Sequence, residues 1–334
     1  MMTQELVDSV EVSHELYCED CIEGCRERIG DGSVDLIITD PPYGIDGTTL
    51  HKHYHRKEEF VLDGYIEVPN EEYFEFTQQW IQEAERILRP GGTLYVLSGY
   101  THLIDILNAL RETSLVERNH LIWKYNFGVH TKKKYVSSHY HILYYVKPGG
   151  EPTFNTYCRY GPQERKDNGG SLNYEDREDV WTIKKEYKQG QTKNKNELPN
   201  ALLQKLIQYS SDEGNVVCDL FLGGFSTAKV ALGLNRKAIG FELSKPAFDY
   251  RIKEMEGISP GELLPTLRQP EMENPVNQGK KWTESEKDIL LERFRGLMGA
   301  GSSKKAAIYT LMGEFGRGYF SVFNVIEGST KKSE

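Results

Sequence analysis

Long apolar segments are the feature that this sequence most clearly lacks. Across its 334 residues, no apolar run approaches the roughly 20 residues that a membrane-spanning helix needs. The first residues, MMTQELVDSVEVSHELY, are acidic and do not contain the apolar core of a signal peptide. These absences predict a cytoplasmic protein with no membrane partner.

Cysteine is also scarce. The five cysteines are Cys18, Cys21, Cys25, Cys158 and Cys218, and an odd count without a secretion signal argues against a disulfide framework. The first three, with His14, have a zinc-like spacing. The same segment, however, also has to form a strand and a turn before the apolar run at 33–39. We therefore expect neighbouring or buried thiols here, and no metal site.

Positive charge is in short supply overall but is concentrated in two segments. The net charge is −9. Residues 124–200 carry 14 Lys and Arg against 9 Asp and Glu, a net of +5, and residues 279–334 carry 10 against 7, a net of +3. Two basic segments on an acidic body suit a protein that contacts phosphates at chosen places. Ordinary variation of surface charge is the alternative, and charge alone does not decide between them.

Short apolar strands alternate with amphipathic helices along most of the chain. The run SVDLIIT at 33–39 is typical of a buried parallel strand, and residues 72–88 have apolar side chains at helical spacing. Such alternation predicts an α/β fold with a Rossmann-like, doubly wound, mostly parallel sheet. Further strands are expected at 93–97, 120–124, 141–146, 216–221 and 237–241, and further helices at 103–110, 198–209, 226–232 and 246–255.

Composition divides the chain into five parts. Residues 1–147 and 197–255 form the two halves of the α/β domain, and residues 148–196, rich in Gly, Asn, Lys and Glu, form an irregular insertion between them. Residues 256–280 contain four prolines and are predicted to be a linker. Residues 281–327 are predicted to form a small helical module, with helices at 284–297, 303–315 and 319–326.

The tetrapeptide Asp40-Pro41-Pro42-Tyr43 directly follows the predicted strand at 33–39. Functional residues of open α/β sheets lie at the carboxyl ends of strands. The two prolines stiffen the backbone and remove two N–H donors. A carboxylate, carbonyl oxygens and an aromatic face remain, which suit the binding of an amino group. An ordinary strand-ending turn is the alternative.

A second motif, Asp219-Leu220-Phe221-Leu222-Gly223-Gly224-Phe225-Ser226-Thr227, leads from a strand into a helix. Adjacent glycines let a backbone approach a ligand closely. About 20 residues later, Gly240-Phe241-Glu242 ends the next strand, where a carboxylate is placed to accept hydrogen bonds from ribose hydroxyls. An ordinary strand–turn–helix connection is the alternative.

Together the two motifs resemble the β group of DNA amino-methyltransferases, in which a D/S-P-P-Y/F motif precedes an F-x-G-x-G loop and the target-recognition region lies between them. The resemblance covers residues 15 to about 254. It implies a DNA-binding enzyme that uses S-adenosyl-L-methionine, flips a base out of double-stranded DNA and methylates its exocyclic amino group. The sequence departs from the family at Leu220, usually proline, and at Phe225, usually glycine. Because a phenylalanine adopts positive φ only at a cost, we expect the loop to differ in shape.

The resemblance also assigns residues to roles. Asp40, Pro41, Pro42 and Tyr43 are the expected catalytic residues, and Tyr43 would stack on the flipped base. The expected cofactor-binding residues are Asp20, Cys21, Asp40, Asn200, Asp219, Phe221, Leu222, Gly223, Gly224, Ser226, Thr227, Glu242 and Leu243. The expected DNA contacts are Lys52, His53, Arg56, Lys132, Lys133, Lys134, His139 and Arg317. Arg317 lies in a Gly-Arg-Gly turn that could belong to a helix-turn-helix, and a packing or dimerisation appendage is the alternative for that module.

In the resembled family, the motif form that begins with Asp mostly marks adenine N6 enzymes, and the form that begins with Ser mostly marks cytosine N4 enzymes. The leading Asp40 therefore favours adenine N6. Cytosine C5 chemistry needs a cysteine nucleophile, usually after a proline, and no cysteine here follows a proline. An inactive DNA-binding relative is a further alternative, motivated by Leu220 and Phe225. A methyltransferase that acts on RNA or on a protein glutamine is another alternative. The leading Asp40 and the order of the two motifs argue against it. A restriction-modification role with a cognate nuclease, and a homodimer, are also left open.

Overall fold

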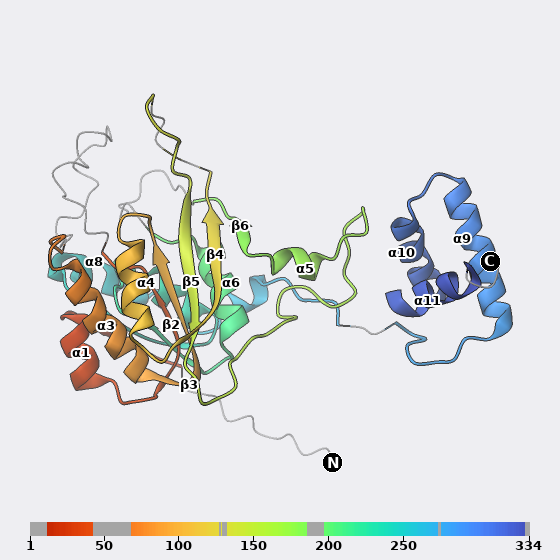
Figure 1. Ribbon diagram of the computed structural model, residues 1–334. Coiled ribbons are helices and arrows are strands. Elements are labelled where there is room, and N and C mark those ends of the chain that lie inside the picture. The colour runs from red at the N-terminus through yellow and green to blue at the C-terminus, as the bar shows by residue number, and fades with distance from the viewer. Residues whose placement is uncertain are drawn as a thin grey trace, which may run out of the picture. The chain divides into compact units, whose positions relative to one another are not determined.

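The computed structural model describes residues 12–42, 68–126, 128, 132–185, 197–272 and 275–330 (Figure 1). They divide into two compact units, one of Met1–Thr156 with Asp179–Leu267 and the other of Tyr157–Glu178 with Arg268–Glu334. No helix in the described part of the chain combines the length and apolar character that crossing a bilayer requires.

The first unit is built on an eight-stranded sheet with the order β1-β8-β7-β2-β3-β5-β4-β6. The β3–β5 and β5–β4 pairs are antiparallel and the other five pairs are parallel. The strands are β1 His14–Tyr17, β2 Val34–Thr39, β3 Leu88–Ser98, β4 Val116–Lys124, β5 His139–Val146, β6 Val180–Thr182, β7 Val216–Asp219 and β8 Lys237–Phe241. This topology confirms the predicted mostly parallel α/β sheet.

Both faces of the sheet are covered, which explains why its central strands are mostly apolar. In β2, Ile37 packs into the core beneath α1 (Cys21–Arg28), α3 (Tyr73–Ile87) and α4 (Leu103–Arg111). Leu36 and Ile38 face the opposite core, with α6 (Asn200–Ser210) and α7 (Ser226–Gly233). Met255 of α8 (Lys245–Met255) joins that second core. Figure 1 shows α1, α3 and α4 together on one face of the sheet.

The structure differs from the sequence-based boundaries in two places. Residues 148–196 are not irregular throughout, because β6 adds a parallel strand beside β4 and α5 (Leu172–Asp176) belongs to the second unit. The predicted linker at 256–280 begins as part of the first unit, where Leu263 packs against Gly233 around the short 3₁₀ helix η2 (Leu264–Thr266). Neither feature has a periodic signal, because a three-residue strand and a single turn are too short to show one.

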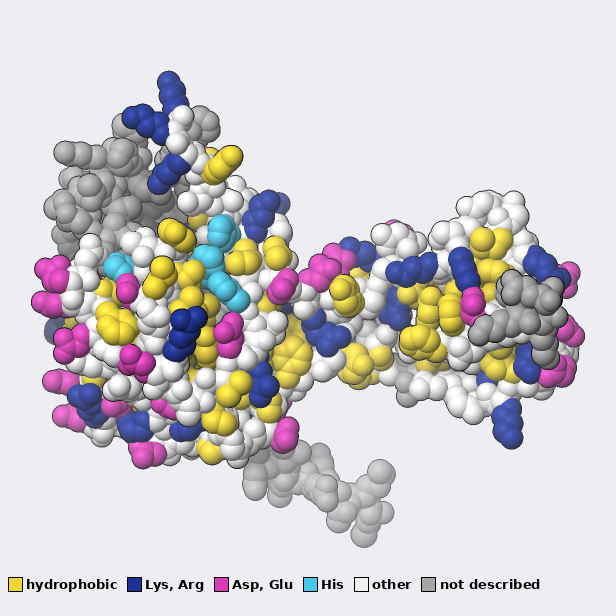
Figure 2. Space-filling model, viewed as in Figure 1, with side chains coloured by type: hydrophobic (Ala, Val, Ile, Leu, Met, Phe, Trp, Pro, Cys, Tyr) yellow, Lys and Arg dark blue, Asp and Glu magenta, His cyan; other side chains and the backbone are white. Residues whose placement is uncertain are grey.

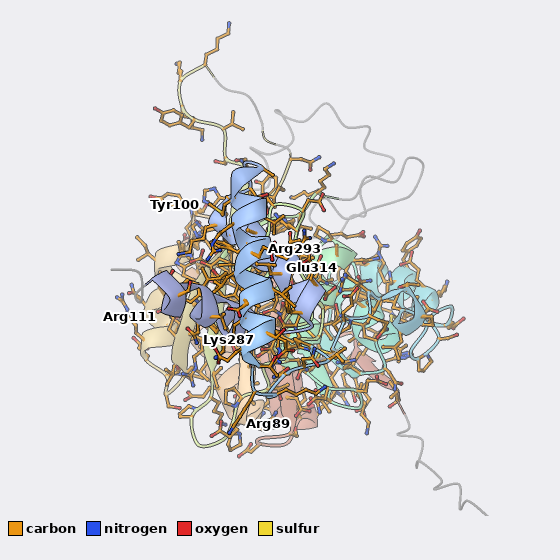
Figure 3. All side chains as sticks on the ribbon, turned by 90° about the vertical axis from the view of Figure 1, so that its right-hand side faces the viewer. Arg89, Tyr100, Arg111, Lys287, Arg293 and Glu314 are labelled. Atoms are coloured by element: carbon orange, nitrogen blue, oxygen red, sulfur yellow. The ribbon has the colours of Figure 1, made fainter. Side chains whose placement is uncertain are left out.

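The second unit contains the three helices expected at the end of the chain: α9 Glu284–Gly299, α10 Lys304–Phe315 and α11 Tyr319–Thr330. A capping box of Thr283 and Glu286 begins α9, and Gly316 ends α10 in the left-handed region with φ 57°. Arg293 of α9 donates to Glu314 of α10 at 3.0 Å, and both are labelled in Figure 3. The helices enclose their own core of Leu290, Ile308, Leu311, Met312, Val322 and Ile326.

Candidate active site

The two sequence motifs leave the sheet side by side. Strands β2 and β7 are parallel neighbours, with Leu36 paired to Val217 and Ile37 to Cys218. The segment Asp40–Pro42 follows β2, and the loop from Leu220 to Phe225 follows β7, so both lie at the carboxyl edge. Chain order reverses between these strands, and ligands of doubly wound sheets bind at such a switch point.

The first motif is held from its far side by α3. Pro41 is buried, and Asp40 and Pro42 are half-buried. The hydroxyl of Tyr73, the first residue of α3, donates a hydrogen bond of 2.7 Å to the carbonyl oxygen of Pro42. Tyr43, the predicted stacking residue, lies outside the described residues. The described part of the motif therefore offers a partly exposed carboxylate beside carbonyl oxygens.

Asp219 joins the two motifs through a buried carboxylate. Its Oδ1 accepts from the hydroxyl of Thr39 at 3.3 Å and from the amide of Phe221 at 3.1 Å. Burial raises its pKa to about 6, against the lowering effect of hydrogen bonds from Thr227, Phe221 and Thr39. Asp219 thus faces inward, where it connects the end of β2 to the start of the glycine loop.

The glycine loop contains two residues with positive φ. Gly223 has φ 49°, and Phe225 also takes the left-handed conformation with φ 59°. Phe225 therefore adopts the costly conformation that led us to expect a different loop shape. The conformation costs about 1–2 kcal/mol. Full burial of the ring, which meets Phe248 edge-on at 5.6 Å, offsets this cost with about 2–3 kcal/mol. Leu220 is 1% exposed and belongs to the core on the α3 side of the sheet.

Glu242 is anchored at the end of β8 by two backbone amides. Its Oε2 accepts from Gly223 at 2.9 Å and its Oε1 from Ser244 at 2.7 Å. Burial raises its pKa. Each carboxylate oxygen has further lone-pair capacity, so this side chain can also accept hydrogen bonds from two neighbouring hydroxyls.

An aromatic group of α3 supports the other side of the loop. The ring of Phe221 lies 5.9 Å from that of Phe76 and 5.7 Å from that of Trp80, the latter edge-on. Trp80 is fully buried, whereas Phe221 is only partly buried. The exposed part of Phe221 is thus available to a flat ligand.

A charged cluster that the sequence did not indicate closes around Gly224. Arg251 of α8 is 4% exposed and donates to Glu197 at 2.7 Å and to Glu254 at 3.0 Å. Lys229 pairs with Glu254 and donates to the carbonyl of Gly224 at 3.2 Å. A Cβ added to Gly224 would lie 2.5 Å from the Cγ of Glu197, so a larger residue there would displace the Glu197 side chain. No spacing in the sequence connects positions this far apart.

The remaining predicted cofactor residues occupy the same edge of the sheet. Asp20 follows β1 and caps α1 by accepting from Ile22 at 2.9 Å and Glu23 at 3.1 Å. Glu242 donates its amide to the carbonyl of Tyr17, which places the ends of β1 and β8 together. Cys21, Leu222 and Thr227 are buried, Ser226 is half-buried, and Asn200 and Leu243 are exposed.

The predicted DNA contacts divide into three groups. Lys132, Lys133, Lys134 and His139 are exposed, and they lie in or beside the connection between β4 and β5, which leaves the same edge as Asp40. Figure 2 shows Lys and Arg side chains at the tip of this connection and histidines below it. Lys52, His53 and Arg56 lie outside the described residues.

Arg317 is placed differently from the prediction. It is 2% exposed, its guanidinium lies 4.3 Å from the centre of the Trp282 ring, and it donates to the carbonyls of Lys280 and Lys281. A buried guanidinium of this kind cannot reach a DNA phosphate. It connects the turn between α10 and α11 to the start of α9.

The cysteines show no metal-like arrangement. Cys21, Cys25 and Cys218 are buried, and burial raises the pKa of each thiol, whereas Cys18 is exposed. Within the described ranges, no group of three or more His, Cys, Asp or Glu residues could hold a metal ion.

Comparison with known proteins matches the part of the chain that holds the site. The family model described as DNA methylase matches residues 34–253. The chain is 34% identical to the type II methyltransferase M.BamHI of Bacillus amyloliquefaciens over 68% of its own length and 54% of that enzyme. It thus spans about half of this relative. It is 29% identical to the DNA adenine methyltransferase YhdJ of Escherichia coli K12, over 69% of its own length and 79% of that protein.

Solved structures show the same fold at low sequence identity. The protein TTHA0409 of Thermus thermophilus, in complex with S-adenosyl-L-methionine, matches 74% of this chain and 95% of its own, with a TM-score of 0.53 and 23% identity. The cytosine-N4-specific PvuII DNA methyltransferase matches 78% of this chain and 95% of its own, with a TM-score of 0.54 and 16% identity.

Proposed function

Because the chain belongs to the DNA methylase family whose model matches residues 34–253, we propose that it methylates the exocyclic amino group of a DNA base, with adenine N6 as the target. The observation that carries the proposal is the adjacency of the two motifs. Asp40–Pro42 and the glycine loop leave neighbouring parallel strands, and Asp219 accepts hydrogen bonds from Thr39, directly before Asp40, and from Phe221 in the glycine loop.

The residues at the edge fit S-adenosyl-L-methionine, whose sulfonium supplies an activated methyl group when the cofactor is bound. Glu242, already oriented by two amides, would accept the ribose hydroxyls. Phe221 offers a partly exposed ring, and the backbone at Gly223 has no side chain to hinder approach. Asp219 supports the loop from beneath rather than contacting the cofactor.

The first motif would hold and orient the base. The exocyclic nitrogen is a weak nucleophile because its lone pair is delocalised into the ring. Asp40 and the carbonyl of Pro41 would accept its two N–H bonds, which favours a more tetrahedral nitrogen with an available lone pair. Bound S-adenosyl-L-methionine would supply the methyl carbon, and the electron pair of its carbon–sulfur bond would remain on sulfur. The proton lost by the nitrogen would be released to water along its hydrogen bond to Asp40. Alignment of the two substrates supplies most of the acceleration in such a transfer.

Nucleoside analysis by mass spectrometry tests this proposal. DNA incubated with the protein and S-adenosyl-L-methionine should gain N6-methyladenine. The variant Asp40→Asn should lose about 100-fold or more of the rate, because it replaces a placed charge with an amide. Asp31→Asn is the matched control, since Asp31 lies before the same strand with its side chain 81% exposed.

Each outcome of this experiment has a distinct meaning. No methylated base from the unaltered protein would refute the enzymatic proposal. N4-methylcytosine without N6-methyladenine would refute the choice of base, since the same two acceptors can bind a cytosine amino group. Binding of labelled cofactor tests the alternative of an inactive relative, which Leu220 and Phe225 motivate.

Double-stranded DNA is the proposed partner, with Lys132–Lys134 and His139 as contacts to its backbone. The relatives named type II methyltransferases favour a restriction-modification role with a cognate nuclease. Protection of the methylated site from such a nuclease would support it. A homodimer stays a prediction, for which light scattering of the purified protein is the measurement.

A further inference from the structure

Two of the three residues in the turn Asp40–Pro42 are prolines. Pro41 and Pro42 have no backbone N–H, so they cannot donate the hydrogen bonds that usually hold a loop. The described structure supplies a donor from elsewhere: the hydroxyl of Tyr73 lies 2.7 Å from the carbonyl oxygen of Pro42. Tyr73 is 2% exposed, so water cannot easily replace this hydroxyl.

The ring of Tyr73 is itself held in place. It stacks on His102 with ring centres 3.8 Å apart and planes at 19°. The Nδ1 of His102 lies 2.7 Å from Oδ2 of Asp105 on α4, and its Nε2 lies 3.1 Å from Oδ1 of Asn70. The position of a tyrosine hydroxyl is set by its ring, and here the ring is fixed between α3 and the start of α4.

Helix α3 also contacts the loop on the cofactor side. Phe76 and Trp80, on successive turns beyond Tyr73, meet the ring of Phe221 at 5.9 and 5.7 Å. Helix α3 therefore contacts the turn Asp40–Pro42 through its first residue and the glycine loop through residues on its following turns. Methyl transfer needs the nitrogen, carbon and sulfur in line, and small displacements of either substrate slow it.

We propose that Tyr73 is a positioning residue for methyl transfer, which acts through the Pro42 carbonyl to hold Asp40 and the Pro41 carbonyl in place relative to the glycine loop. This inference rests on the proposed function. In this inference, α3 sets the distance between the base and S-adenosyl-L-methionine. Because Tyr73 is 2% exposed, removal of its hydroxyl should affect the transfer step and leave the binding of each substrate intact.

The test is Tyr73→Phe, which removes only the hydroxyl. Single-turnover transfer from a preformed complex with S-adenosyl-L-methionine and DNA should slow about tenfold, which corresponds to about 1.4 kcal/mol in the barrier. Cofactor affinity by calorimetry and DNA affinity should change by less than about twofold, the scatter expected of a neutral change. This separation of rate from affinity is not expected of a residue that only stabilises the fold.

Tyr145→Phe is the matched control. Tyr145 is also buried, belongs to the same core, and donates its hydroxyl to Glu117 at 3.3 Å, but it lies toward the opposite end of the sheet. Its variant should transfer at the unaltered rate. If Tyr73→Phe does not fold, His102→Ala is the second test, because it removes the ring that stacks on Tyr73 and leaves the Tyr73 hydroxyl. The transfer rate of this variant should fall while its cofactor affinity stays unchanged.

Two results would overturn the inference. One is Tyr73→Phe transferring as fast as the unaltered protein, and the other is a slower rate fully explained by weaker cofactor or DNA binding. Absence of transfer by the unaltered protein is a different result, since it would refute the proposed function itself.

Discussion

Asp219 shows how a single buried carboxylate can hold two segments that are 180 residues apart in the sequence. It accepts from Thr39, the residue directly before Asp40, and from Phe221 in the glycine loop. A carboxylate at this depth is stable only with such donors, since burial without them is costly. The two motifs are thus connected by one side chain in addition to the pairing of their strands.

This arrangement predicts a pH-dependent contribution to stability. The folded-state pKa of Asp219 is raised to about 6 from an ordinary 3.8, so the folded chain favours the protonated form. The resulting contribution to the free energy of unfolding is fully present below about pH 4 and is lost as pH rises through about 6. Asp219→Asn removes this dependence. Relative to the variant, the free energy of unfolding of the unaltered protein should therefore fall by on the order of 2 kcal/mol between pH 4 and 7.

Denaturant unfolding of both proteins at several pH values measures the difference. Only the difference between them is informative, because other carboxylates titrate in both. A constant difference across this range would show that the Asp219 carboxyl does not change its protonation as proposed.

Individual residues show where sequence reasoning succeeded and where it stopped. The positions of Asp40 and Glu242 directly after strands were predictable because the local pattern reveals where each strand ends, and their roles stay predictions. The positive φ of Phe225 could not be predicted from backbone preference alone, because the burial of its ring, which offsets the cost, is a tertiary effect. Tyr73 was not identified at all. Its role depends on a tertiary contact to Pro42, and within its own helix it looks like any other core aromatic.

At the scale of elements, ion pairs connect α8 to the segment just before α6, and these residues hold the glycine loop in place. Arg251 of α8 bridges Glu197, just before α6, and Glu254. Glu197 in turn packs directly on Gly224. Because the Arg251 guanidinium is buried, breaking its pairing costs more than breaking an exposed ion pair, even though Lys229 still pairs with Glu254.

We predict that Arg251→Met weakens cofactor binding about tenfold and lowers the free energy of unfolding by about 3 kcal/mol. Lys245→Met is the control in the same helix. Lys245 and Asp249 are 75% and 54% exposed, and such pairs contribute about 0–1 kcal/mol. Calorimetric titration with S-adenosyl-L-methionine and thermal unfolding provide the two measurements. Equal effects of the two substitutions on cofactor affinity would contradict this role of the ion pairs.

Elements with a clear apolar pattern were predictable, including the five-residue β8 at 237–241, and those without such a pattern were not. The helix at 72–88 and the strand at 33–39 have enough residues for their apolar period to be read, and both agree with α3 and β2 within a residue or two. β4 begins four residues before the predicted strand because its first five residues are exposed and lack the apolar pattern. β6 forms from three residues whose pairing with β4 is non-local.

At the scale of the whole molecule, the chain consists of two units with separate cores. The two cores of the first unit contain only residues up to Leu267, and the core of the second unit begins with Trp282 packing on Leu290 and its neighbours. The catalytic proposal therefore involves the first unit alone. The second unit includes segment Tyr157–Glu178, where Arg165 lies over the ring of Tyr309 and Gly169 packs against it.

We predict that deletion of residues 279–334 leaves cofactor binding and the unfolding transition of the first unit intact but weakens DNA binding at least tenfold. The deleted segment has a net charge of +3, and loss of phosphate contacts should also make the affinity less dependent on salt. Phe320→Ser is a gentler test, because Phe320 is 74% exposed on α11 and its loss leaves the module's core intact. If α11 contacts DNA, this variant should weaken binding without changing the salt dependence. Unchanged DNA affinity and salt dependence after the deletion would instead make the module a packing or dimerisation appendage, because the first unit alone would then account for all the phosphate contacts.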